Sequence, residues 1–284
     1  MQTRPAIAIV GIGNAFPAAM DPEHFWENII AGKDCSREPP EKRWSVDIEN
    51  VYNGKIDTDQ VNSRKACFVD DFELDLEGLA IEKDLIEALD PMFQVLLHAG
   101  NHAWKDCHTN NLNKKRTGII IGNIALPTDY SSQLAEEILD RIIATTNSED
   151  LATHTVSETH PLNRYVAGLP GMILARSLGL QGPCFTLDAA CASSLYSLKY
   201  AIDELQSGRM DTMLCGGLSR PDSLYTQMGF STLGAISSSG RCSPFDHKAD
   251  GLVVGEGSGI LVIKRLEDAL RDEDHIYATV AGIG

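Results

Sequence analysis

Cys191 is the residue whose position in this sequence most favours chemistry. It lies in "DAACASSL" (188–195), where an expected strand over 182–188 meets an expected helix from Cys191 to about Gln206. A thiol in the first turn of a helix lies near the positive end of the helix dipole and near free backbone N–H groups, which stabilise a thiolate. The small neighbouring residues leave room for a substrate. This pattern predicts that Cys191 is a nucleophile and that its own N–H donates to an oxyanion.

The alternative for Cys191 is an inert buried thiol, which is the usual environment of a free cysteine.

Three other motifs suggest chemistry less strongly. His98 and His102 have the spacing of two metal ligands on one helix, but no third ligand is placed, so ordinary packing is favoured and no metal site is expected. "GIGNAF" (11–16) lacks the third glycine of a dinucleotide loop. "GEGSG" (255–259) lacks the Lys-Ser/Thr of a phosphate loop and is expected to form a tight bend beside the site.

The charge of the chain excludes several classes of partner. The 284 residues include 40 acidic and 24 basic side chains, for a net charge of −16. This balance argues against binding to nucleic acid or to an anionic membrane surface. The seven cysteines are odd in number and contain no C-x-x-C pair, which favours a reducing, cytoplasmic setting. No apolar run reaches the length of a membrane span. "AIAIVGIG" (6–13) behind Arg4 weakly resembles a signal peptide, but it is short, broken by glycines and followed by Asn14 and Pro17, so a buried strand is expected.

Hydrophobic periodicity and helix-end signals predict alternating strands and helices. The expected strands cover residues 7–12, 117–123, 182–188, 211–217, 259–266 and 276–284, and the expected helices cover 21–32, 91–104, 131–144, 165–178, 191–206, 222–229 and 267–271. This order predicts an α/β fold in which the first five strands form a mostly parallel, five-stranded sheet that is covered by helices on both faces. In the helix from Cys191, the apolar face is expected to hold Leu195, Leu198, Ile202 and Leu205.

Several motifs resemble one family. "DAACASSL" (188–195) resembles the active-site motif of β-ketoacyl synthases, the condensing enzymes of fatty acid and polyketide synthesis. Further similarity to ketosynthase domains of type I synthases extends in order along nearly the whole chain, through residues 7–17, 21–34, 89–104 and 240–259. "GNIALPTD" (122–129) and "LHAG" (97–100) are similar to the polyunsaturated-fatty-acid-synthase branch.

The resemblance implies a thiolase-like fold of two similar βαβαβαββ halves. Residues 1–271 then form the N-terminal half, and residues 272–284 begin the C-terminal half. It also implies that Cys191 accepts an acyl group from the phosphopantetheine thiol of an acyl carrier protein, with no bound cofactor. Two histidines then promote decarboxylation of a malonyl unit, and the carbanion attacks the Cys191 thioester to give a 3-oxoacyl product. The family further implies a homodimer joined through strand 182–188, within a multifunctional synthase.

The chain departs from the family pattern at the histidines. The His-Gly-Thr-Gly and Asn-x-Gly-His motifs do not occur in the 284 residues, and neither His247 nor His275 matches them, so neither receives a role. Two alternatives therefore stay open. A non-catalytic partner of a ketosynthase is disfavoured by the intact Cys191, and a thiolase acting on coenzyme A esters is disfavoured by the type I motifs near the N-terminus.

Overall fold

The computed structural model describes residues 4–44, 46–54, 59–70, 72–108, 112–146 and 159–283. Its centre is a six-stranded sheet with the order β3-β2-β4-β5-β1-β6. The strands are β1 (Ile7–Ala15), β2 (Thr117–Asn123), β3 (Cys184–Leu187), β4 (Thr212–Ser219), β5 (Gly257–Arg265) and β6 (Ala278–Val280). The helices are α1 (Pro22–Ile30), α2 (Ile48–Val51), α3 (Lys83–Ala88), α4 (Pro91–Asp106), α5 (Asp129–Thr146), α6 (Pro170–Leu178), α7 (Ser193–Gln206), α8 (Ser223–Thr232) and α9 (Leu266–Arg271).

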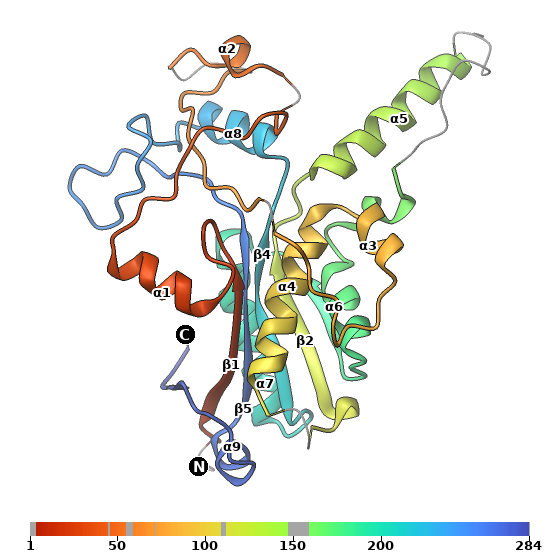
Figure 1. The fold of residues 1–284 in the computed structure, drawn as a ribbon, viewed down its shortest axis with the longest axis vertical. Helices are drawn as coiled ribbons and strands as arrows, with labels where there is room; N and C mark the ends of the chain where they lie inside the picture. Colours follow the sequence, from red (N-terminus) through yellow and green to blue (C-terminus); the bar gives the residue numbers. More distant parts are fainter. Residues whose placement is uncertain are drawn as a thin grey trace.

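The strand directions correct one expectation. The α/β class and the first five strands are confirmed, but the sheet is not mostly parallel, and it has six strands instead of five because β6 pairs with β1. Only β2 with β3 and β2 with β4 are parallel neighbours, whereas β5 is antiparallel to β4 and β1, and β6 is antiparallel to β1. Helix α8 lies beyond one end of the sheet (Figure 1). Because the chain enters β5 at the same end at which it leaves β4, β5 runs antiparallel to β4.

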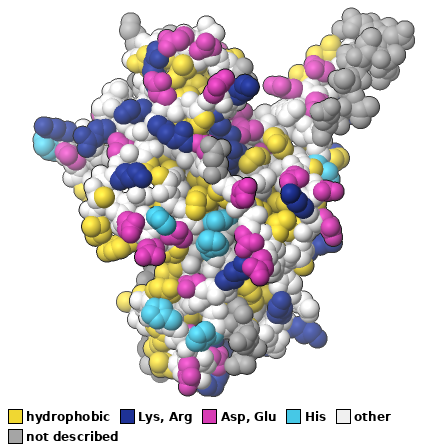
Figure 2. Space-filling view, viewed as in Figure 1, with side chains coloured by type: hydrophobic (Ala, Val, Ile, Leu, Met, Phe, Trp, Pro, Cys, Tyr) yellow, Lys and Arg dark blue, Asp and Glu magenta, His cyan; other side chains and the backbone are white. Residues whose placement is uncertain are grey.

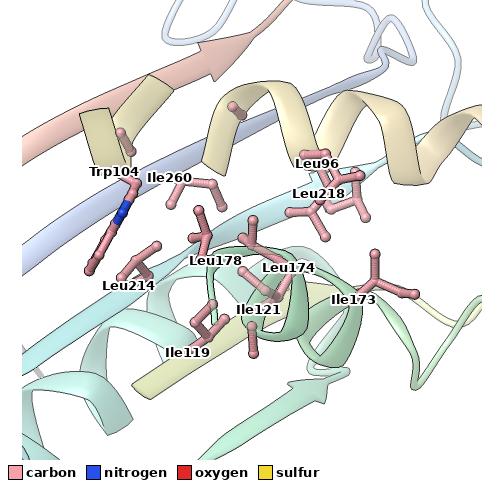
Figure 3. Packing of buried hydrophobic residues seen from close by; sticks show 14 of the residues in the cluster. Leu96, Trp104, Ile119, Ile121, Ile173, Leu174, Leu178, Leu214, Leu218 and Ile260 are labelled. Atoms are coloured by element: carbon pink, nitrogen blue, oxygen red, sulfur yellow. The ribbon is translucent and has the colours of Figure 1, made fainter. Parts of the chain in front are cut away.

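Helices cover both faces of the sheet, as the alternation predicts. Ile119 and Ile121 of β2 pack in one core with α4 and α6, and Ile120 between them packs on the other face with α7. Figure 3 shows Leu96 of α4 and Leu174 of α6 in the first core, beside side chains from the strands. The period of two along a strand sends successive side chains to opposite faces. Because helices cover both faces, every residue of β2 is buried, as expected for a central strand.

Two glycines of β1 let α4 lie close against the sheet. A Cβ on Gly11 would lie 2.5 Å from the Ala103 carbonyl oxygen, and one on Gly13 would lie 2.1 Å from the Ala99 oxygen. "GIG" (11–13) therefore lies within strand β1, where its glycines allow α4 to pack closely, and does not form a nucleotide-binding turn.

Cap residues mark the predicted start of α1 and the predicted end of α7. Asp21 accepts a hydrogen bond from the His24 N–H at 2.9 Å at the start of α1, and Gly208, with φ 71°, follows the end of α7. The expected helix over 165–178 is wrong at its start, because α6 begins only at Pro170. Proline lacks an N–H and has a fixed φ, which suits the first turn of a helix and disfavours its interior.

Helix α5 projects from the body of the molecule, as Figure 1 shows at the upper right. Part of its surface is apolar and exposed, at Ile138, Leu139, Ile142 and Ile143. Among the described helices, none is long and apolar enough to cross a membrane.

Candidate functional site

Cys191 lies in a short turn between β3 and α7. The turn is a 3-10 segment over Ala190–Ala192, and α7 begins at Ser193. The expectation that the helix starts at the cysteine is therefore corrected by two residues. Cys191 is exposed, as an accessible nucleophile requires. Ala190, immediately before it, has φ +50°, a left-handed conformation that costs a residue with a Cβ about 1–2 kcal/mol.

Hydrogen bonds from neighbouring side chains hold this strained turn. The Asp188 carboxylate accepts from the Ala190 N–H at 2.8 Å and from the Ala125 N–H at 2.9 Å, and these two bonds lower the pKa of Asp188. Ser193 Oγ accepts from the Ala189 N–H at 2.8 Å and donates to the Ala190 carbonyl oxygen at 2.7 Å. The backbone that presents Cys191 is thus fixed before any substrate arrives.

The first turns of α7 lie unusually close to the sheet. Ser197 Oγ donates to the Ile120 carbonyl oxygen and accepts from the Gly216 N–H, both at 2.8 Å. A Cβ on Gly122 would lie 2.5 Å from the Ser193 carbonyl carbon. Only small residues fit between α7 and the sheet at this contact, and Ser193 and Ser197 occupy it. The prediction that Leu195 belongs to the buried apolar face of α7 is wrong, because Leu195 is 61% exposed.

Cys191 lies on the wall of a cavity of about 590 Å³ at the end of the sheet. Its lining is mainly apolar side chains and glycines, among them Phe16, Phe68, Ile124, Leu126, Leu218, Phe230 and Gly257. The expected tight bend at "GEGSG" (255–259) is wrong over its second part, because Gly257–Gly259 begin strand β5. The expected close approach of two backbones is present beside the cavity, since a Cβ on Gly216 would lie 1.9 Å from the Gly259 oxygen. An apolar cavity of this kind can hold the hydrocarbon part of a ligand beside the Cys191 thiol.

A second cavity, of about 520 Å³, lies between α1 and the segments around Cys35, Cys67 and Cys242. Four residues line both cavities: Phe16, Cys67, Gly255 and Glu256.

A buried ionic network supports this end of the sheet. The Glu256 carboxylate pairs with Arg43 and accepts from the Val69 N–H at 3.1 Å. Asp129 pairs with Arg43 and, at 3.2 Å, with Arg220, while burial raises the pKa of Asp129. Sequence reasoning missed these residues because their partners are 86 to 213 positions apart and carry no local motif.

The thiols differ strongly in their surroundings. Burial raises the pKa of Cys67 to about 11 and the pKa values of Cys107 and Cys215 to about 12. Cys191 and Cys242, by contrast, are exposed.

The histidines do not gather around Cys191. Neither His247 nor His275 lines its cavity. A ring nitrogen of His98 lies 2.7 Å from the Met20 carbonyl oxygen, and its ring packs 4.1 Å from that of His102, whose pKa is lowered by burial and by His98. Across the described ranges, no group of three His, Cys, Asp or Glu side chains is placed to hold a metal ion.

Comparison with known proteins gives a consistent relationship. The family model described as the N-terminal domain of β-ketoacyl synthase matches residues 4–269. Polyketide synthase PksL of Bacillus subtilis is 33% identical over 291 residues, covering 100% of this chain and 6% of that protein. Polyketide synthase PksN of the same organism is 31% identical over 283 residues, covering 97% of this chain and 5% of that protein. The chain thus spans a small part of these relatives.

Solved structures agree with the sequence comparison. The PfaC keto synthase-chain length factor superposes with a TM-score of 0.88 at 34% identity, over 97% of this chain and 31% of that one. The ketosynthase from module 6 of the bacillaene synthase of Bacillus subtilis gives a TM-score of 0.75 at 29% identity, over 98% and 43% of the two chains. The expected thiolase-like fold of ketosynthases is thereby confirmed. The chain belongs to the β-ketoacyl synthase family, whose N-terminal domain it spans.

Proposed function

We propose that this chain is the N-terminal half of a condensing ketosynthase domain and that Cys191 is its acyl-accepting nucleophile. The observation that carries the proposal is an exposed thiol on a strained strand-to-helix turn at the wall of an apolar cavity. The half comprises residues 1–271, and residues 272–284 begin the next half. The end of the family match at residue 269 and the end of α9 at Arg271 support this boundary.

In the loading step, the Cys191 thiolate attacks the carbonyl carbon of an acyl thioester. The Cys191 N–H stabilises the oxyanion; no acceptor in the described part of the chain engages this N–H, so it is available. The C–S bond to the carrier breaks, the acyl group stays on Cys191, and the carrier thiolate leaves and takes up a proton. In the condensing step, a malonyl thioester loses CO₂ and the carbanion attacks the acyl carbon. The new C–C bond releases the Cys191 thiolate and a 3-oxoacyl thioester.

An acyl carrier protein, with the acyl group on its phosphopantetheine, is the proposed donor. Carrier proteins are acidic, and the net charge of this chain is also negative, at −16. The fold nevertheless gathers Lys33, Lys65 and Arg241 around the second cavity and Asp34, from three separate segments. Lys and Arg side chains are frequent at the upper left of the face in Figure 2, where Figure 1 draws α2, α8 and their loops. The cluster of Lys33, Lys65 and Arg241 supports electrostatic docking of an acidic carrier.

A homodimer is the proposed assembly, joined through β3. This strand is the outer strand of the sheet, and its Phe185 side chain is 41% exposed. An open edge with an exposed apolar residue suits pairing with the same strand of a second copy about a two-fold axis. The free state of all seven cysteines supports a reducing, cytoplasmic setting.

Loading and condensation can be tested separately on the 284-residue chain. Incubation with a radiolabelled acyl-carrier protein is expected to transfer the acyl group to Cys191, and Cys191→Ala is expected to abolish the transfer. Addition of malonyl-carrier protein is expected to give no 3-oxoacyl product, because the two histidine motifs are not among the 284 residues. Loss of one oxyanion donor alone costs about 10²–10³ in rate. Acyl transfer that survives Cys191→Ala would refute the role of Cys191. Robust condensation would refute the half-domain assignment.

A further inference from the structure

The cavity that holds Cys191 and the second cavity meet at a common wall. Phe16, Cys67, Gly255 and Glu256 line both cavities. An acyl chain that extends from Cys191 toward this wall stops where these residues close the space.

Among these four residues, Phe16 has a large side chain that makes no hydrogen bond or ion pair, so it can be replaced without breaking one. Gly255 has no side chain. The backbone of Cys67 is bound on both sides, since its N–H donates to the Val254 oxygen and its carbonyl oxygen accepts from the Glu256 N–H, both at 2.9 Å. The Glu256 carboxylate is fixed by Arg43 and by the Val69 N–H. The phenyl ring of Phe16 is therefore the replaceable part of the wall.

The ring of Phe16 packs directly against the backbone of two glycines, Gly257 and Gly259. A Cβ on Gly257 would lie 2.7 Å from the ring, and one on Gly259 would lie 3.0 Å from it. The backbone of Phe16 is fixed by its N–H to the Ala19 oxygen at 2.8 Å and by the return bond at 2.9 Å. On the other side the ring meets Phe25 of α1, with the ring centroids 4.8 Å apart, and Phe25 is 39% exposed. Removal of the ring thus opens space without breaking a hydrogen bond.

We propose that Phe16 determines the length of the acyl chain that the Cys191 cavity accepts, by separating it from the second cavity. The inference rests on the proposed function, in which Cys191 carries the acyl group. With the ring present, chain length is limited by the cavity of about 590 Å³. With the ring removed, the chain continues into the space of about 520 Å³ beyond it.

The test measures binding without acyl transfer, so that its failure is distinct from a failure of the proposed function. In a Cys191→Ala background, saturated fatty acids of 6 to 18 carbons displace a fluorescent fatty acid, and the affinity of each is determined. Each buried methylene is expected to increase affinity about fourfold until the cavity is filled. Phe16→Ala is expected to move this plateau to longer acids, and Phe16→Leu, which keeps more of the packing on the glycines, is expected to move it less.

Phe25→Ala is the matched control. It removes the same ring from the residue that contacts Phe16, but Phe25 lines the second cavity only, so the plateau should stay where it is in the parent chain. A plateau at the parent length in both folded Phe16 variants would overturn the proposal. An equal shift in Phe25→Ala would also overturn it. Acyl transfer to Cys191 in the parent chain, measured separately, tests the proposed function itself.

Discussion

The fold places the seven thiols in different surroundings, so we expect them to differ in reactivity. At pH 8 a thiol with a pKa of about 12, such as Cys107 or Cys215, is ionised to about one part in ten thousand, and the thiolate is the reactive form. Cys191 is exposed at the start of a helix. We therefore expect limiting iodoacetamide to alkylate Cys191 first, as peptide mass spectrometry can measure. Preferential labelling of Cys67 or Cys215 would contradict the assignment of the nucleophile.

Asp211 gives the chain a defined acid sensitivity. Its carboxylate binds Arg116 at 2.9 Å and Arg265 at 2.6 Å, and these bonds lower the pKa of Asp211 to about 2. A depressed carboxyl pKa contributes stability that is complete above the unfolded value, about 3.9, and is lost as the pH falls toward 2.

Asp211→Asn is therefore expected to reduce the free energy of unfolding at pH 7. Because the Asp211 side chain is 38% exposed, solvent screening limits the effect to about 1 kcal/mol. The difference from the parent should shrink between pH 4 and pH 2, as urea denaturation at a series of pH values can measure. Asp84→Asn, at an exposed site on α3, serves as the control. A difference that stays constant with pH would refute the ionic origin.

At the scale of elements, the contact between β1 and α4 depends on the absence of side chains. In Gly13→Ala the new Cβ would lie 2.1 Å from the Ala99 oxygen and 2.4 Å from the Ala103 nitrogen, so the helix must move off the sheet. We expect a loss of about 3 kcal/mol in the free energy of unfolding. Gly168→Ala makes the same chemical change where nothing lies within 4 Å of the new Cβ, and should alter stability by less than about 0.5 kcal/mol. Equal effects in the two variants would show that packing on α4 is not the cause.

Local signals predicted the elements well where one residue determines an end. Asp21 caps the start of α1, Pro91 is the first residue of α4, and Gly208 follows the end of α7. The turn that presents Cys191 was also recognisable, because its small residues follow a strand directly. Two features were not predictable in this way. The direction of β5 depends on where α8 and its loops lie, and the partners of Glu256 come from distant segments. Both are set by tertiary packing, which no sequence window contains.

For the whole molecule, the open edge at β3 predicts assembly. Phe185→Lys places a charge on the outer strand, a substitution that blocks edge pairing. The parent chain is expected to sediment as a dimer and Phe185→Lys as a monomer with unchanged circular dichroism. Leu270→Lys is the control, since Leu270 is 63% exposed on α9, at a distance from β3 along the sheet order. A monomeric parent chain, or a dimer that survives Phe185→Lys, would exclude pairing through β3.

The position of β1 between β5 and β6 also determines how the chain can fold during synthesis. Ile7 pairs with Arg265 of β5 and with Val280 of β6, so both neighbours of the first strand are made roughly 250 residues after it. Ribosomes add about 5–20 residues per second, and the roughly 250 residues between β1 and β5 therefore take about 12 to 50 s. Once α4 (Pro91–Asp106) has been made it can cover one face of β1, but both hydrogen-bonding edges of β1 stay open for the whole interval. The nascent chain thus carries an unpaired apolar strand until β5 and β6 have been made, and its yield in cells should depend on chaperones and on the rate of translation.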